Sequence, residues 1–213
     1  MAGLIMEYID LEHWPRKEHF EFFYKMDYPQ FNVSINLDVT HFLDFVKKER
    51  ISFYYAMIFA STDTANQLVN FRYRIRGDQV ILHDKLNASF TDVMKDSELF
   101  KMVMVDMNDD IIAFTHQAQE KSEQQKEFII YENAEERDDL IYFTCAPWFS
   151  FTQLTHPIAL SREDSVPKIS WGKYFREGEK VLLPFSIQAN HALMDGVHVG
   201  KYIEKLQTYL NSL

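Results

Sequence analysis

Residues 188–199, QANHALMDGVHV, set a histidine four residues before an aspartate-glycine pair, directly after the apolar stretch VLLPFSIQAN at 181–190. The apolar stretch is partly β-branched, which predicts a buried strand. After Asp195 apolar residues recur at three- and four-residue steps, which predicts a helix with one buried face. Asp195 is placed to cap this helix, so His191 is expected in a strand-to-helix turn. The periodic residues are Val199, Tyr202, Ile203, Leu206, Tyr209 and Leu210.

The rest of the chain predicts an α+β fold without internal repeats. Apolar periodicity indicates helices at 15–25, 52–69 and near 110–125, and Thr40 is expected to cap a further short helix. A hairpin is expected in 71–84, FRYRIRGDQVILHD, with its turn at Gly77 and Asp78. Because the strands do not alternate regularly with the helices, we expect a mixed sheet with helices packed on it, not a doubly wound parallel sheet. The remaining strands are expected at 31–39, 88–93, 101–106, 139–146 and 168–175.

Length and composition favour one globular domain over residues 1–213. The chain is 46% hydrophobic and 15% aromatic, and its 6 Gly and 6 Pro leave no room for a flexible linker. The net charge of −10 argues against a nucleic-acid or anionic-membrane surface, because both need a basic footprint. The EKSEQQKE run at 120–127 is expected to be a solvated helix face.

Cysteine usage and the N-terminal residues favour a cytoplasmic protein. Cys145 is the only cysteine, so no intrachain disulfide is possible. The start, MAGLIMEYIDLEHW, lacks a basic region followed by a long apolar core, and no apolar run reaches the roughly 20 residues that span a bilayer. Cys145 lies in an apolar strand, where an inert buried thiol is expected instead of a nucleophile.

The residues alone leave the role of the 188–199 stretch open. A lone histidine near an apolar strand is more often an ordinary core or surface histidine than a catalyst, and Asp195 fits a helix cap with no further role. His191, Asp195 and His198 also have the spacing of a two-histidine, one-carboxylate metal set. That set would need one continuous helix through Gly196, which the strand-like run before His191 argues against.

A family resemblance favours a catalytic role for the 188–199 stretch. NHALMDG at 190–196 resembles the HHxxxDG motif of the trimeric chloramphenicol acetyltransferases. The stretches WPRKEHFEFF (14–23), TCAPWFSF (144–151) and KISWGKYFREGEKVLLPFSIQ (168–188) are similar to the same family in the same order, so nearly the whole chain is covered. The resemblance implies the two-layer fold of CoA-dependent acyltransferases and transfer of acetyl from acetyl-CoA to a hydroxyl of chloramphenicol, which inactivates the antibiotic. It implies no metal.

The resemblance also assigns roles to five residues. Because a thioester is already activated, acetyl transfer needs mainly a base for the acceptor hydroxyl and a donor for the oxyanion. His191 stands at the position of the general base, and Thr144 at that of a serine that donates to the oxyanion. Asp195 and Arg16 match a structural ion pair that holds the turn, and Ser170 matches a threonine that holds a water. The chain has no GxSxG, P-loop or GxGxxG motif, so acetyl-CoA is expected to bind in a shaped tunnel.

The sequence departs from the family pattern around the acceptor. Asn190 replaces the first motif histidine, so chemistry is expected to survive with altered packing. An aromatic wall is kept, although Phe23 lacks the hydroxyl of a tyrosine. Polar groups stand where the family has apolar or aromatic ones, and unpaired charge is costly to bury. The wall residues are Phe22, Phe23, Phe31 and Phe100, and the polar substitutions are Asp27, Asp164 and Lys168.

The resemblance implies a homotrimer with active sites between subunits. His191 would come from one subunit and much of the aromatic wall from its neighbour. Three alternatives stay open: an acetyltransferase for another hydroxylated small molecule, a catalytically weak relative that binds a hydrophobic ligand or CoA without turnover, and a metalloprotein. A metal analysis of the purified protein would test the last of these.

Overall fold

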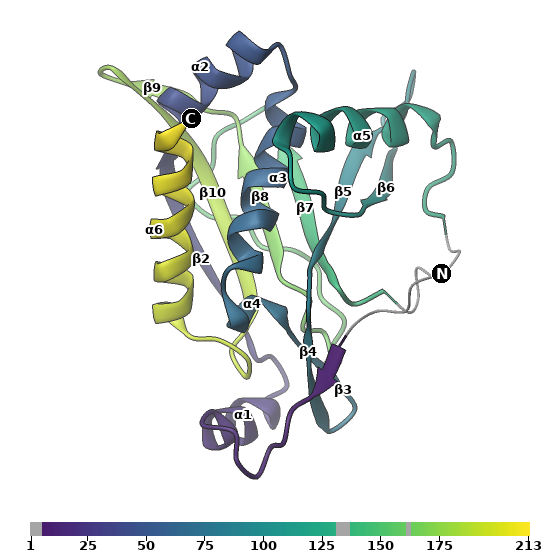
Figure 1. The fold of residues 1–213 in the computed structure, drawn as a ribbon, viewed down its shortest axis with the longest axis vertical. Helices are drawn as coiled ribbons and strands as arrows, with labels where there is room; N and C mark the ends of the chain where they lie inside the picture. Colours follow the sequence, from purple (N-terminus) through teal and green to yellow (C-terminus); the bar gives the residue numbers. More distant parts are fainter. Residues whose placement is uncertain (1–5, 131–136, 161–162) are drawn as a thin grey trace.

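The computed structural model describes residues 6–130, 137–160 and 163–213 (Figure 1). Residues 1–5, part of the start in which no secretory signal is expected, lie outside this range. Within it no helix has the length and apolar character needed to cross a bilayer. The helices are α1 (Lys17–Tyr24), α2 (Thr40–Glu49), α3 (Phe53–Asn66), α4 (Val69–Arg72), α5 (Ile111–Gln124) and α6 (Gly196–Ser212). The strands are β1 (Met6–Tyr8), β2 (Gln30–Asp38), β3 (Tyr73–Arg76), β4 (Gln79–His83), β5 (Asn87–Val93), β6 (Phe100–Val105), β7 (Leu140–Ala146), β8 (Lys168–Gly172), β9 (Phe175–Glu177) and β10 (Lys180–Asn190).

The main sheet is mixed, as the irregular order of strands and helices predicts. Its strand order is β2-β10-β8-β7-β5-β6, with β9 also paired to β10. β7 runs parallel to both β5 and β8, and the other pairs are antiparallel. A smaller antiparallel sheet has the order β1-β4-β3 and contains the predicted hairpin. The α+β fold class is therefore confirmed.

One face of the main sheet carries the hydrophobic core. Figure 1 shows α2, α3, α5 and α6 gathered on this face, with α1 beside the smaller sheet at the other end of the molecule. Strand residues such as Phe185 and Ile187 are fully buried here, together with Tyr202 and Leu206 of α6. Because alternate strand residues point to opposite faces, the apolar half of β10 faces the helices.

The opposite face of β10 is polar and is also buried. Ser186, Gln188 and Asn190 are each at most 2% exposed. Residues 154–156 and Asp164 contact them: the Ser186 hydroxyl donates to the carbonyl of Leu154 at 2.8 Å, the amide of His156 donates to Gln188 at 2.8 Å, and Asn190 donates to the carbonyl of Asp164 at 3.1 Å. Strand β10 is therefore enclosed on both faces, and its hydrogen bonds tie the long segment after β7 to the sheet.

Two local expectations need correction. Thr40 does not cap α2: it is the first helical residue, and the Asp38 carboxylate accepts hydrogen bonds from its amide at 3.1 Å and its hydroxyl at 2.6 Å. The strand expected over 168–175 ends at Gly172. A Cβ on Gly172 would lie 2.8 Å from the carbonyl oxygen of Phe149, so the close passage of that chain requires glycine.

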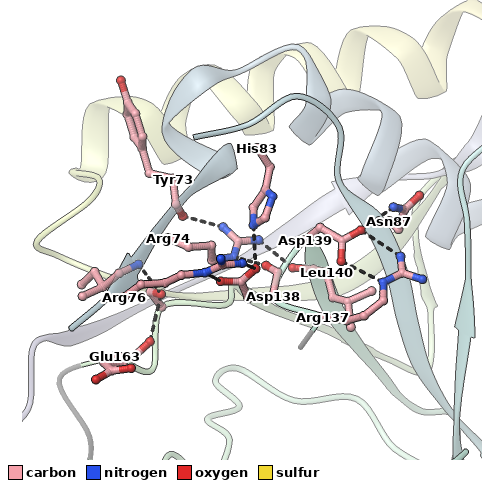
Figure 2. Close-up of polar contacts among 12 residues, drawn as sticks. Tyr73, Arg74, Arg76, His83, Asn87, Arg137, Asp138, Asp139, Leu140 and Glu163 are labelled. Carbon is pink, nitrogen blue, oxygen red and sulfur yellow. Dashed lines mark hydrogen bonds and ion pairs between the residues drawn. The ribbon is translucent and has the colours of Figure 1, made fainter. Parts of the chain in front are cut away.

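A buried charged network joins the smaller sheet to the start of β7 (Figure 2). Asp138 accepts two hydrogen bonds from Arg76, at 2.8 and 2.7 Å, and one from Nε2 of His83 at 2.8 Å. Arg74 is fully buried and donates to the carbonyls of Asp138 and Leu140, both at 2.6 Å. Burial lowers the pKa of Arg74 to about 10, so the guanidinium stays charged at neutral pH.

Candidate active site

The turn between β10 and α6 holds His191 in a fixed backbone conformation. The amide of His191 donates to the carbonyl of Pro29 at 2.7 Å, and the side chain of Asn190 accepts from the amide of Ala192 at 2.9 Å. Asp195 is the N-cap residue of α6. The predicted strand, turn and capped helix are therefore all present, and His191 lies in the turn between them.

Arg16 connects the N-terminal part of the chain to this turn. Its guanidinium donates to both carboxylate oxygens of Asp195, at 2.5 and 2.7 Å, and to the carbonyls of Ala192 at 2.9 Å and His191 at 2.8 Å. The Arg16 side chain is only 10% exposed. Hydrogen bonding from Arg16 is the main cause that lowers the pKa of Asp195, so its carboxylate is ionised at neutral pH.

The imidazole of His191 lies between two phenylalanine rings and a carboxylate. Phe23 stacks on it with ring centroids 3.9 Å apart and planes at 7°, and Phe31 lies at 4.7 Å and 44°. Nδ1 of His191 is 3.2 Å from Oδ1 of Asp195, an ion-pair distance, but the angles leave Nδ1 without a hydrogen-bond partner among the described residues. Because Nδ1 is buried and the side chain is 33% exposed, the accessible part of the ring is the edge away from Nδ1.

The polar residues expected to disturb the acceptor pocket are not unpaired. Nζ of Lys168 lies 2.6 Å from Oδ1 of Asp164, and their side chains are 9% and 14% exposed. The carbonyl of Asp164 accepts from Asn190 at 3.1 Å and from Gln30 at 2.7 Å. The concern about unpaired charge is therefore wrong for Asp164 and Lys168, because each neutralises the other. Asp27 is exposed.

Thr144 and Ser170 are neighbours, but they lie far from His191 of the same chain. They are register partners on the parallel strands β7 and β8, and Ser170 is paired with Ser186 of β10. Ser186 precedes His191 by five residues, which at about 3.3 Å per residue places the hydroxyls about 17 Å away along the sheet. Ser170 is 1% exposed, and its hydroxyl has no hydrogen-bond partner among the described residues.

The four phenylalanines of the expected wall are divided between two places. Phe23 and Phe31 contact His191 of their own chain. Phe22 is 62% exposed on α1. Phe100 is 48% exposed on β6, at the opposite edge of the sheet from β2, and its ring lies 5.6 Å from that of Phe128.

Sequence reasoning missed a set of exposed aromatic residues that follow β7 and β8. An open groove of about 710 Å³ lies nearby, between β2 and the segment after β7. The sequence signal for this set was the run of aromatic side chains directly after two strand ends, because most apolar side chains of this size are buried. The exposed residues are Trp148, Phe149, Tyr174 and Phe175, and the groove is lined by Ser34, Ile35, Asn36, Ser150, Phe151, Thr152 and Phe175.

Two other groups were candidates for chemistry: the metal set of His191, Asp195 and His198, and the thiol of Cys145. Nδ1 of His198 accepts a hydrogen bond from the amide of Asp195 at 2.9 Å, so this nitrogen is occupied by backbone. The described residues contain no group of three or more His, Cys, Asp or Glu side chains arranged to hold a metal ion. Burial raises the pKa of Cys145 to about 12, which keeps its thiol protonated.

Comparison with known proteins decides the family. The sequence profile of the family described as chloramphenicol acetyltransferase matches residues 4–207. The chain belongs to this family. A chloramphenicol acetyltransferase of Klebsiella sp is 31% identical over 201 residues, which is 94% of this chain and 92% of the relative. One from Staphylococcus aureus is 25% identical, with 96% of each chain covered.

Solved structures agree on the fold. A chloramphenicol acetyltransferase structure superimposes with a TM-score of 0.88 at 23% identity, covering 97% of this chain and all of the other. A dihydrolipoamide acetyltransferase of Azotobacter vinelandii has a TM-score of 0.68 at 13% identity, covering 91% of this chain and 85% of the other. The dihydrolipoamide acetyltransferase therefore shares the fold of this chain.

Proposed function

We propose that this chain is an acetyl-CoA-dependent O-acetyltransferase that acetylates a hydroxyl of chloramphenicol and so inactivates the antibiotic. Family membership over residues 4–207 supports the reaction class, and the names of the relatives support the acceptor. The observation that carries the proposal is the His191 turn, where Arg16 and Asp195 fix the backbone and leave the far edge of the imidazole accessible. We further propose that residues 1–213 act as one domain and that the protein works in the cytoplasm, for which the single Cys145 is the support.

In this reaction His191 acts as general base. Its unprotonated Nε2 takes the proton from the acceptor hydroxyl while the hydroxyl oxygen attacks the thioester carbonyl carbon. The tetrahedral oxyanion accepts a hydrogen bond from the Thr144 hydroxyl, and the neighbouring Ser170 hydroxyl holds a water. When the C–S bond breaks, the imidazolium returns the proton to the CoA sulfur. The products are the acetyl ester and CoA.

The site is completed by a second copy of the chain. The separation of about 17 Å between His191 and the Thr144 hydroxyl is too large for one tetrahedral intermediate to contact both. A closed ring with a repeated head-to-tail contact brings His191 of one copy to Thr144 of the next. Exposed Phe100 and Phe128 at the far sheet edge fit such an interface, and we propose a homotrimer.

Acetyl-CoA approaches along the ends of β7 and β8. Its thioester has to reach Thr144, and the exposed rings of Trp148 and Tyr174 lie four residues beyond Thr144 and Ser170 in the sequence. These rings offer an apolar surface to the flexible arm that carries the thioester. No glycine-rich phosphate loop is present in the sequence, so contacts along this arm carry much of the binding.

A different acceptor is the second candidate. Lys168 and Asp164 form an ion pair, and the buried Nε2 of His156 has no hydrogen-bond partner among the described residues. These groups make this end of the sheet more polar than an aromatic acceptor requires. An acetyltransferase for another hydroxylated small molecule fits these residues. A catalytically weak relative is a third possibility for the same site.

The decisive experiment follows thiol release from acetyl-CoA with and without chloramphenicol. We expect drug-dependent release by the native protein and its loss in His191→Ala. His116→Ala, an exposed histidine on α5, is the matched control and is expected to behave like the native protein. A folded protein that binds acetyl-CoA but releases no thiol with the drug would reject chloramphenicol as acceptor and lead to a screen of other alcohols.

A further inference from the structure

The first turn of α6 contains a second histidine, His198, which is hydrogen-bonded to the turn that bears His191. His198 occupies the N3 position of the helix, and its Nδ1 accepts the backbone amide of the N-cap residue Asp195 at 2.9 Å. Both halves of a capping box are present, and His198 fills the N3 place that Glu or Gln usually takes. The carboxylate of Asp195 is meanwhile turned to Arg16, with which it makes two hydrogen bonds.

We propose that His198 is a positioning residue for acetyl transfer, which holds the backbone of Asp195 so that its carboxylate meets Arg16 and lies beside Nδ1 of His191. Both oxygens of the carboxylate accept from Arg16, and the carboxylate also accepts from the backbone of His198 in the capping box. The Asp195 amide is held in its orientation by the His198 ring. The kinetic consequence rests on the proposed function, whereas the geometry does not.

This role requires a neutral imidazole. Nδ1 can accept a hydrogen bond only when it carries no proton, so His198 must be the tautomer with its proton on Nε2. The charged and titratable groups around it are Arg16 from the segment before α1, Asp195 and His191 from the turn, and Lys201 from the next turn of α6. Burial, followed by the charge of Arg16, lowers the pKa of His198. The ring is therefore neutral at neutral pH.

Acid should weaken the site through His198. Protonation of His198 turns its acceptor into a donor facing the Asp195 amide, which breaks the capping bond and loosens the carboxylate. As the pH falls through the His198 pKa, kcat/KM of the native protein should therefore fall further than that of a variant whose residue 198 cannot titrate.

Glutamine at position 198 removes this titration. A Gln at N3 supplies the same capping acceptor without titrating. We expect His198→Gln to keep kcat/KM within about threefold of native at pH 8 and to lose less of it than the native protein as the pH is lowered. We expect His198→Ala, which has no acceptor, to lose about fivefold or more at pH 8. The matched control is His116→Gln on α5, with native activity and the native pH profile.

Ring ¹⁵N chemical shifts of the histidine-labelled full-length protein test the geometry without turnover. We expect Nδ1 of His198 to have the shift of an unprotonated acceptor at pH 7.5, and the Asp195 amide to shift when His198 titrates. A protonated Nδ1 at this pH, or the native pH profile in His198→Gln, would overturn the proposal. If no acetyl transfer occurs but both NMR results are as expected, the proposed function fails and the positioning geometry stands.

Discussion

Arg16 and Asp195 are 179 residues apart in the sequence, yet the guanidinium contacts both carboxylate oxygens, at 2.5 and 2.7 Å. The same guanidinium binds two backbone carbonyls of the intervening turn, those of His191 and Ala192. This fork of donors suits arginine and not lysine. Asp195 has its ion-pair partner in Arg16, whereas Nδ1 of His191 has no hydrogen-bond partner within the part of the chain that the structure describes.

Removal of Arg16 should therefore destabilise the protein. Arg16→Ala leaves the Asp195 carboxylate and two carbonyls without their donor, so we expect the free energy of unfolding to fall by about 2–3 kcal/mol. Asp195→Asn and the double variant complete a mutant cycle measured by urea denaturation. A coupling energy below about 0.5 kcal/mol would mean that the pair does not hold the turn.

Thr144→Val should lower activity without a large loss of stability. If the Thr144 hydroxyl donates to the oxyanion, kcat should fall by about 10²–10³-fold with little change in KM. Thr144→Ser should retain most of the activity, because it keeps the hydroxyl. Thr208→Val, which changes an exposed threonine of α6, is the control. An equal fall in both threonine-to-valine variants would argue for a general folding defect.

Two inactive variants should complement each other if the site lies between subunits. Mixed trimers of His191→Ala and Thr144→Val subunits contain some interfaces where both native residues meet, so co-expression should restore part of the native activity. Each variant expressed alone stays inactive at the same protein concentration. Sedimentation velocity checks that the mixed protein is trimeric. No recovery in a verified mixed trimer would place His191 and Thr144 in separate sites.

Asp138 should be a main support of the smaller sheet. Burial by itself would raise its pKa, but hydrogen bonds from Arg76 and His83 hold that pKa well below the ordinary value. Asp138→Asn should lower the free energy of unfolding by about 2–4 kcal/mol at pH 7. The native contribution is complete above about pH 3.9 and is lost as the pH falls through the lower native pKa. Asp109→Asn, a fully exposed carboxylate, should change urea stability little.

His156 should make the free energy of unfolding depend on pH at higher pH values than Asp138 does. Burial, followed by the charge of Lys168, lowers its pKa, so the unfolded chain binds this proton more readily. Its contribution is full above about pH 6.5 and declines as the pH falls toward the native pKa. Urea denaturation between pH 7.5 and 5 should therefore show a smaller loss in His156→Gln than in the native protein. The comparison fails if His116→Gln flattens the curve equally.

Local sequence patterns predicted most of the elements. The three- and four-residue spacing after Asp195 identified α6, and the run at 181–190 identified β10, because periodicity records which side of an element is buried. Thr40 was misassigned because a hydroxyl next to a helix start fits both the cap and the first helical position. Asp38 takes the capping bonds instead, since its carboxylate accepts from both donors of Thr40.

The sequence by itself determined the family, the α+β class and the turn that bears His191, because motif order and residue periodicity are properties of the chain. Only the tertiary structure decided which distant groups meet. Lys168 and Asp164 neutralise each other, the polar face of β10 is contacted by residues 154–156 and Asp164, and Ser170 is aligned with Ser186 and not with His191. These relations depend on strand register and on the path of a long segment across the sheet. No local pattern records either of them, because a single register shift would change every contact while the sequence stayed the same.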